Sequence, residues 1–158
     1  MTPEQYQALH DDMAARPLLA GAIAAGDDQA IAAYYNQAAD PACLVWRTWV
    51  TKEEAFEQAL DWSEVAGLNA AEEKIWNWMF QAGGMNPSKL NIRAGMVHAL
   101  NSAPNTKAAL IALSVRPATR YERLFAVGAG TAQEPATMSI EGALSVTDAS
   151  VARGNYGQ

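Results

Sequence analysis

The alternation of apolar and polar side chains is most regular over residues 69–100, where it predicts two helices joined by a sharp turn. On a helix over residues 69–81, large apolar side chains cover one broad arc and polar side chains cover the opposite arc. The apolar arc holds Ile75, Trp76, Trp78, Met79 and Phe80, and the polar arc holds Glu73, Lys74, Asn77 and Gln81. Asn69 is suited to cap this helix, and the Gly83-Gly84 pair is suited to end it.

A second apolar stripe follows residues 86–88, whose sequence Asn-Pro-Ser favours a helix start. The stripe consists of Ile92, Met96, Val97 and Leu100. Because the connection between the two stripes is short, they predict a helical hairpin.

Capping boxes mark three further helix starts. Thr2, Thr51 and Thr119 each precede a Gln or Glu by three positions, which allows reciprocal bonds between side chain and backbone. The helix after Thr51 is expected to end at Gly67, and Asp27 is expected to open another helix. Residues 107–115 are apolar on nearly all faces, so that helix is expected either at the centre of the molecule or at an oligomer interface.

Residues 42–50, ACLVWRTWV, predict an extended segment because they are rich in β-branched and aromatic residues. Residues 128–142 contain many small and turn-forming residues and predict a long loop or loose hairpin. We expect residues 42–50 either to pack as an extended segment across helices or to join a strand near the C-terminus. Within the loop, Met138 and Ile140 alternate with polar residues, so a short strand there is the best candidate partner. Residues 145–154 predict a last short helix, and Asn155 to Gln158 a mobile tail.

The predicted fold class is mainly α: a compact helical bundle with one or two short extended strands and an irregular C-terminal segment. We expect a helical core domain over residues 1–127 and an extended C-terminal segment over residues 128–158. A chain of 158 residues is long enough to bury a core without metal or disulfide support. No apolar run reaches the ~20 residues that span a bilayer, and the N-terminus lacks the pattern of a secretory signal. We therefore expect no membrane association.

Charge is distributed unevenly along the chain. Residues 1–84 hold 13 acids and 4 bases, and residues 85–158 hold 4 acids and 7 bases, which gives −9 and +3 and a total of −6. The acidic balance opposes binding to nucleic acid, so no sequence-specific nucleic-acid binding is expected. The asymmetry is compatible with stacking of copies through opposite charges, and equally with an ordinary solvated surface.

The residues provide few candidates for catalysis. His10 lies beside Asp11 and Asp12, but adjacent helix positions point in different directions, so a metal site would need ligands from elsewhere. His98 has no neighbouring carboxylate in the sequence, and the lone Cys43 is flanked by apolar residues, as an inert buried thiol would be. We expect no enzymatic activity, no catalytic residues, no cofactor and no metal site.

Two other patterns resemble functional sites. Glu53, Glu54 and Glu57 could mimic paired catalytic carboxylates, but their position just after a cap fits a solvated helix start. Residues 128–131, Gly-Ala-Gly-Thr, resemble part of a phosphate loop but lack the GKS or GKT ending and the preceding strand.

Aromatic and basic residues suggest protein contacts instead. The chain has five Trp, at spacings typical of a core, with one or two available to anchor a partner. Arg116, Arg120 and Arg123 form the one basic cluster and would share a helix face, although Pro117 interrupts that helix. Pairing with acidic groups of a neighbouring copy is a better reading of this cluster than contact with DNA.

Three segments resemble a group of small proteins of tailed bacteriophages: VWRTWV at residues 45–50, GGMNPSKLNIRAG at 83–95 and PATRYERLFAVGAGTAQEPATMSIEGALSVTDASVARG at 117–154. The resemblance implies a structural virion protein, a ring-forming component of the head-to-tail connector (neck or adaptor). The partners that it implies are copies of the chain in a ring and portal or tail-side connector proteins. The implied location is the virion, and the host cytoplasm during assembly.

The expected contact residues are Arg120, Arg123, Met138, Ile140, Val146 and Val151. Deletion of residues 145–158 is accordingly expected to leave the core folded and to abolish incorporation into particles. The alternative function is a small phage-encoded protein that binds and inhibits a host protein. A small enzyme that depends on His10 or His98 ranks third.

Overall fold

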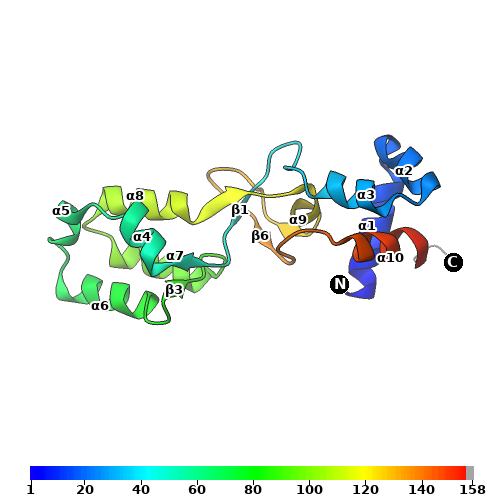
Figure 1. Cartoon of the computed structure of the whole chain (residues 1–158). Coiled ribbons are helices and arrows are strands. Elements are labelled where there is room, and N and C mark those ends of the chain that lie inside the picture. The colour runs from blue at the N-terminus through cyan, green and yellow to red at the C-terminus, as the bar shows by residue number, and fades with distance from the viewer. Residues whose placement is uncertain (156–158) are drawn as a thin grey trace. The chain divides into compact units, whose positions relative to one another are not determined.

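The computed structural model describes residues 1–155, and helices dominate it (Figure 1). This confirms the prediction of a mainly α protein. The chain forms two compact units. Unit 1 comprises Met1–Cys43 and the chain from Pro117 onward, and unit 2 comprises Leu44–Arg116. In the described part of the chain, no helix combines the length and the apolar character needed to cross a membrane.

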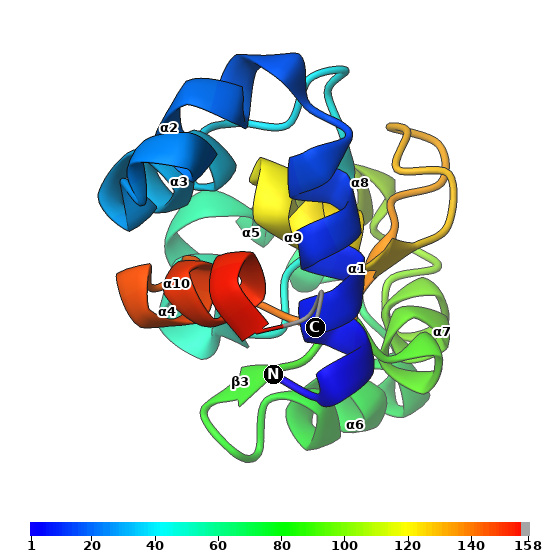
Figure 2. The same cartoon turned by 90° about the vertical axis from the view of Figure 1, so that its right-hand side faces the viewer.

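Unit 1 is built on three helices that pack together, α1, α3 and α10 (Figure 2). Its elements are α1 (Pro3–Ala14), the 3-10 helix η1 (Pro17–Leu19), α2 (Ala20–Ala25), α3 (Asp28–Tyr35), α9 (Arg120–Leu124), β5 (Ala126–Val127), β6 (Thr137–Met138) and α10 (Val146–Asn155). Each of the three helices contributes a fully buried side chain: α1 contributes Leu9, α3 contributes Ile31 and α10 contributes Ala152. Three short helices thus share one apolar core.

Side-chain caps fix where the helices of unit 1 begin. Thr2 and Thr119 form the expected capping boxes with Gln5 and Glu122. Glu122 is 1% exposed, and its second oxygen accepts from the backbone N–H of Gly142 at 3.0 Å, so the cap of α9 also holds the chain before α10. These bonds satisfy N–H groups that have no partner inside a helix.

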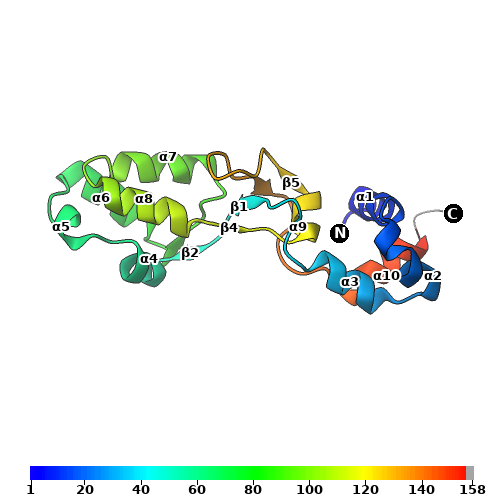
Figure 3. The same cartoon turned by 90° about the horizontal axis from the view of Figure 1, so that it is seen from above.

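Unit 2 is a second helical body with its own core (Figure 3). Its elements are β1 (Leu44–Trp46), β2 (Val50–Thr51), α4 (Lys52–Gln58), α5 (Trp62–Val65), α6 (Ala70–Met79), β3 (Gly84–Met85), α7 (Leu90–Ala99), α8 (Pro104–Leu113) and β4 (Val115–Pro117), whose last residue belongs to unit 1. The apolar helix α8 packs against α4 and α5, where Leu110 is fully buried. This helix was expected either at the centre of the molecule or at an oligomer interface, and it lies at the centre of its unit.

A carboxylate of α5 caps the start of α8. The N-cap residue of α8, Ala103, makes no side-chain capping bond. Glu64 accepts instead from the backbone N–H groups of Asn105 at 3.0 Å and Thr106 at 2.8 Å. Helix α8 therefore depends on a residue about 40 positions earlier for its cap.

The predicted hairpin is confirmed as α6 packed against α7. Asn69 caps α6, and Glu72 completes the capping box and accepts from the backbone N–H and the hydroxyl of Ser102 at 3.1 and 2.6 Å. Two of the predicted inward positions are wrong, because Trp78 is 63% exposed and Val97 is 49% exposed. The apolar arc of α6 is narrower than predicted: Trp76 faces the core, whereas Trp78 extends outward with Lys74 Nζ 4.8 Å from its ring centre.

The strand prediction for residues 42–50 is correct in part, but its partner is wrong. Strand β1 pairs with β4, β2 pairs with β3, and the predicted strand at Met138 pairs with β5 instead. Each strand has only two or three residues, too few for alternation to specify a partner. The predicted helix from Thr51 to Gly67 also divides into α4 and α5, since Asp61 caps a new helix within it.

The compact units divide the chain differently from the predicted boundary between residues 127 and 128. Helix α10 falls within the predicted C-terminal segment, but it buries Ala149 and Ala152 against α1 and α3. Tyr6 donates a hydrogen bond to Asp148, and Arg153 pairs with Asp28 at 2.6 Å. The last helix is therefore part of the core of unit 1. The part of the predicted mobile tail that follows Asn155 lies outside the described residues.

The two neighbouring tryptophans of α6 provide a stability test. Trp76 is 7% exposed and its ring centre lies 4.6 Å from that of Phe80, so Trp76→Ala should lower the free energy of unfolding by about 3–5 kcal/mol. Trp78→Ala should lower it by less than about 1 kcal/mol, because that ring is mostly in solvent. Urea denaturation followed by circular dichroism measures both values. Equal losses would contradict this assignment of the two faces.

Removal of residues 145–158 should unfold unit 1 rather than leave it intact, contrary to the expectation from the sequence. The deletion exposes the apolar surfaces of α1 and α3 that α10 covers. Hydrogen exchange measured by mass spectrometry should show loss of protection in α1 and α3. Wild-type protection of these helices in the truncated chain would refute the prediction.

Candidate functional site

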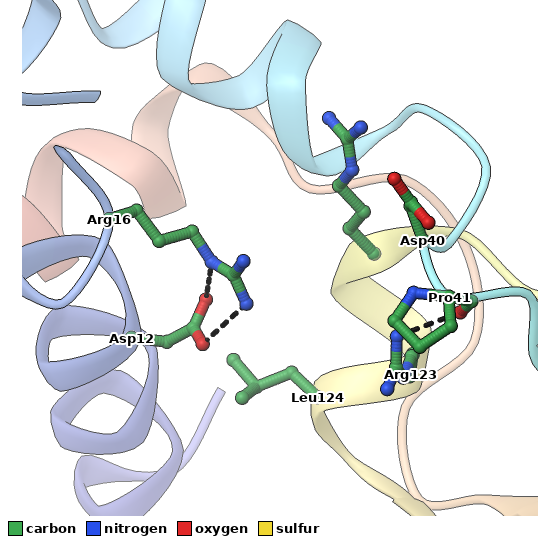
Figure 4. A pocket seen from close by; sticks show the side chains of 7 residues that line it. Asp12, Arg16, Asp40, Pro41, Arg123 and Leu124 are labelled. Carbon is green, nitrogen blue, oxygen red and sulfur yellow. Dashed lines mark hydrogen bonds and ion pairs between the residues drawn. The ribbon is translucent and has the colours of Figure 1, made fainter. Parts of the chain in front are cut away.

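A hollow in unit 1 is lined by charged side chains from three segments (Figure 4). Its volume is about 390 Å³. The lining residues are Asp12 from α1 and Arg16 just after it, Asp40 and Pro41 from the turn after α3, and Arg120, Arg123 and Leu124 from α9. We refer to it as the arginine pocket.

The α1 side of the arginine pocket is a fixed ion pair. Asp12 accepts from Nε and Nη2 of Arg16 at 2.7 and 2.8 Å, and from the hydroxyl of Tyr35 at 2.6 Å. Burial raises the pKa of Asp12, but the bonds from Arg16 and Tyr35 and the positive charges of Arg16 and Arg123 outweigh it and lower the pKa overall. Burial and the bond to Asp12 raise the pKa of Tyr35. Asp12 is therefore a carboxylate at neutral pH.

The α9 side presents two arginines held by other groups. The guanidinium carbon of Arg120 lies 4.1 Å from the ring centre of Tyr34, and its Nη1 donates to Gln37 Oε1 at 2.8 Å. Nη1 of Arg123 donates to the carbonyl oxygen of Pro41 at 2.7 Å, as Figure 4 shows. Both side chains are thus oriented by the chain itself.

Backbone bonds bring the turn after α3 to α9. The amide of Ala39 donates to the carbonyl of Ala118 at 2.9 Å, and the amide of Arg120 donates to the carbonyl of Gln37 at 2.9 Å. These bonds hold residues 37–39 beside residues 118–120, so that Asp40 and Pro41 reach the arginines of α9.

The charges of the two units differ from those of the two sequence halves. Unit 1 holds ten acids and four bases, a net charge of −6, and unit 2 holds seven of each, a net charge of zero. Of the four bases in unit 1, Arg153 pairs with Asp28, and the other three line the arginine pocket. The cations of an acidic unit are therefore concentrated at one place.

The structure separates the predicted basic cluster. Arg120 and Arg123 lie together in the arginine pocket, whereas Arg116 lies in β4 and belongs to unit 2. The prediction that the three share a helix face is wrong, because the helix starts only after Thr119. Arg16 is absent from the predicted contact residues, although its position four residues after Asp12 indicates an ion pair.

The other predicted contact residues do not gather at the pocket. Met138 pairs with Ala126 in the β5–β6 hairpin, and Ile140 packs partly buried against the core of unit 1. Val146 is half exposed at the start of α10, while Val151 is half-buried. Their role in binding a partner stays a prediction.

The residues considered for catalysis belong to different helices: His10 to α1, Glu54 to α4 and His98 to α7. Nδ1 of His10 lies 2.9 Å from the carbonyl oxygen of Ala152, and His98 is exposed in the last turn of α7. Glu54 closes the cap at Thr51 and pairs with Arg47 at 2.8 Å, as expected of a carboxylate at a helix start. Within residues 1–155, no three His, Cys, Asp or Glu side chains lie together as a metal site would require.

Cys43 is buried against Gly130. A side chain at position 130 would meet Sγ of Cys43 at 2.5 Å, and Gly130 has a φ of +69°, so both space and backbone conformation require glycine there. The predicted burial of the thiol is confirmed.

Comparisons with known proteins return no relative. No family model matches the chain, no curated protein matches its sequence, and no solved structure matches its fold.

The ion pair of the pocket provides a pH-dependent prediction. Asp12→Asn should lower the free energy of unfolding by about 2 kcal/mol at pH 7, because bonds to an ionised acceptor are the stronger ones. A lowered pKa in the folded state contributes stability above the unfolded value of about 3.9, and this stability is lost as the pH falls through the folded value. The difference between wild type and variant should thus close below about pH 4.

Urea denaturation at several pH values measures this difference. Asp11→Asn is the matched control, because Asp11 is exposed and its carboxylate accepts from Gln7 on the same helix. It should change stability by less than about 0.5 kcal/mol. A constant difference between wild type and Asp12→Asn from pH 7 to pH 3 would argue against the ion pair.

Proposed function

We propose that this chain is a structural protein of tailed-phage virions, a ring-forming component of the head-to-tail connector that carries no catalytic site. The resemblance of residues 45–50, 83–95 and 117–154 to small proteins of tailed phages suggests the role. The observation that carries the proposal is the unusual exposure of tryptophan.

Three of the five tryptophans extend into solvent. Trp49, Trp62 and Trp78 are 47%, 63% and 63% exposed. Tryptophan is on average one of the more buried residues, and when exposed it is typical of the centres of protein interfaces. Unit 2 therefore offers large apolar side chains for contacts with another chain.

Unit 1 also has exposed apolar residues. Leu18 is 79% exposed and Val127 70% exposed, on η1 and β5 respectively. A subunit of a closed ring uses two different surfaces, one for each neighbour, whereas an inhibitor of a host protein needs one. Exposed apolar residues in both units favour the ring over the inhibitor.

Mass spectrometry of purified particles tests the role. The chain should be recovered in particles at a fixed, low ratio to the major capsid protein, and depleted from the unassembled supernatant of the same lysate. Recovery in the supernatant alone would contradict the virion role and would direct work to a host target.

A tryptophan variant tests the observation behind the proposal. The double variant Trp62→Ser/Trp78→Ser should reduce recovery in particles by about tenfold or more, because each anchor lost from an interface costs about 1–2 kcal/mol or more. The matched control is Gln58→Ser/Asn77→Ser, which changes exposed polar neighbours on α4 and α6. Wild-type recovery of the tryptophan variant would show that these side chains do not anchor the assembly.

A further inference from the structure

We infer that the arginine pocket is a binding site for a carboxylate group, carried by an acidic side chain of a partner protein. The inference rests on the charges and hydrogen bonds of the pocket in unit 1. It does not depend on the connector role or on the exposed tryptophans.

The arginines have donors to spare. Within residues 1–155, Arg120 and Arg123 form hydrogen bonds only through Nη1, so Nε and Nη2 of both have no protein acceptor. Both side chains are half-buried. A planar guanidinium with two free nitrogen positions is suited to the two oxygens of a carboxylate.

The guanidinium groups are held in place before any ligand arrives. Arg120 lies against the ring of Tyr34, Arg123 is bonded to Pro41, and Arg16 is bonded twice to Asp12. The same Tyr34 ring lies 5.9 Å from the guanidinium carbon of Arg16. Fixed donors lose less conformational entropy on binding than free arginine side chains do.

The charge of the pocket matches one carboxylate. Its three arginines and two aspartates, Asp12 and Asp40, leave one positive charge uncompensated. The rest of unit 1 is acidic, with a net charge of −6 over the unit as a whole. That surrounding charge repels the dense phosphates of nucleic acid, whose binding needs many cations, while a single acidic side chain needs only the local excess.

The remaining lining and the size of the pocket also fit an amino-acid side chain. Leu124 contributes an apolar wall that the methylene groups of a glutamate can contact. A volume of about 390 Å³ is sufficient for one or two side chains and too small for a folded element. The acidic residue is therefore expected on an extended segment or a loop of the partner.

Binding of an acidic peptide to the full chain tests the inference. The probe is a capped hexaglutamate peptide, with capped hexaglutamine as the uncharged control. Titration followed by NMR of the arginine Nε–H groups should show saturable shifts at Arg16, Arg120 and Arg123 with hexaglutamate alone. Shifts spread over the arginines and lysines of both units, or equal shifts with hexaglutamine, would overturn the inference.

Variants then locate the site. Arg123→Gln should weaken hexaglutamate binding by about tenfold, the effect expected for one charge-assisted bond. Arg123→Lys keeps the charge but removes the planar pair of donors, and it should weaken binding by about fivefold or more. This second variant tests the site even if Arg123→Gln does not fold. Lys89→Gln, at an exposed position of unit 2, is the matched loss of one charge and should leave the affinity within about twofold.

Inorganic phosphate separates the two kinds of anion. Saturable shifts at the three arginines with phosphate, and none with hexaglutamate, would reject a carboxylate site in favour of a phosphate site. Equal weakening of hexaglutamate binding by Arg123→Gln and Lys89→Gln would also reject it, because each variant removes one positive charge and equal effects would show attraction by net charge alone.

Discussion

The free backbone N–H groups at the starts of short helices are the constraint on which this structure depends most. Helices of four to twelve residues make few internal hydrogen bonds, and the first N–H groups of each have no partner within the helix. Carboxylates satisfy many of these groups, and some of them also fix tertiary structure. Glu72 joins the cap of α6 to Ser102, Glu122 joins the cap of α9 to Gly142, and Glu64 of α5 caps α8. The acidic composition is thus partly a structural requirement and is not only a surface property.

Capping explains why the helix starts were predictable and the tertiary bonds were not. The boxes at Thr2, Thr51 and Thr119 need residues only three positions apart, so the sequence displays them directly. The bond from Ser102 to Glu72 spans 30 positions, and nothing in the sequence identifies Ser102 as its donor. Local bonds define the elements, while bonds between distant residues decide how those elements pack.

The same distinction applies to the strands and to the arginine pocket. The composition of residues 42–50 predicts an extended segment, yet strands of two or three residues carry too little pattern to select a partner. The helix predicted over residues 107–115 also overlaps the start of β4. For the pocket, Arg120 and Arg123 were predictable neighbours because α9 begins at Thr119. Arg16 is about 100 positions away in sequence and reaches them only through the packing of α1 and α3 against their neighbours in unit 1.

The exposed tryptophans and the arginine pocket would bind a partner through different interactions, apolar burial and directed hydrogen bonds. Exposed tryptophans such as Trp62 and Trp78 gain affinity from burial of apolar area, which is strong but only weakly directional. The arginine pocket gains little from area, but its fixed guanidinium groups accept a carboxylate in few orientations. The protein has a net charge of −6, so it repels another acidic chain in most orientations. An acidic side chain meets a local positive charge only when it is placed at the pocket, and the site therefore selects that orientation. Apolar side chains would then supply the affinity of an assembly, and the pocket would select its register.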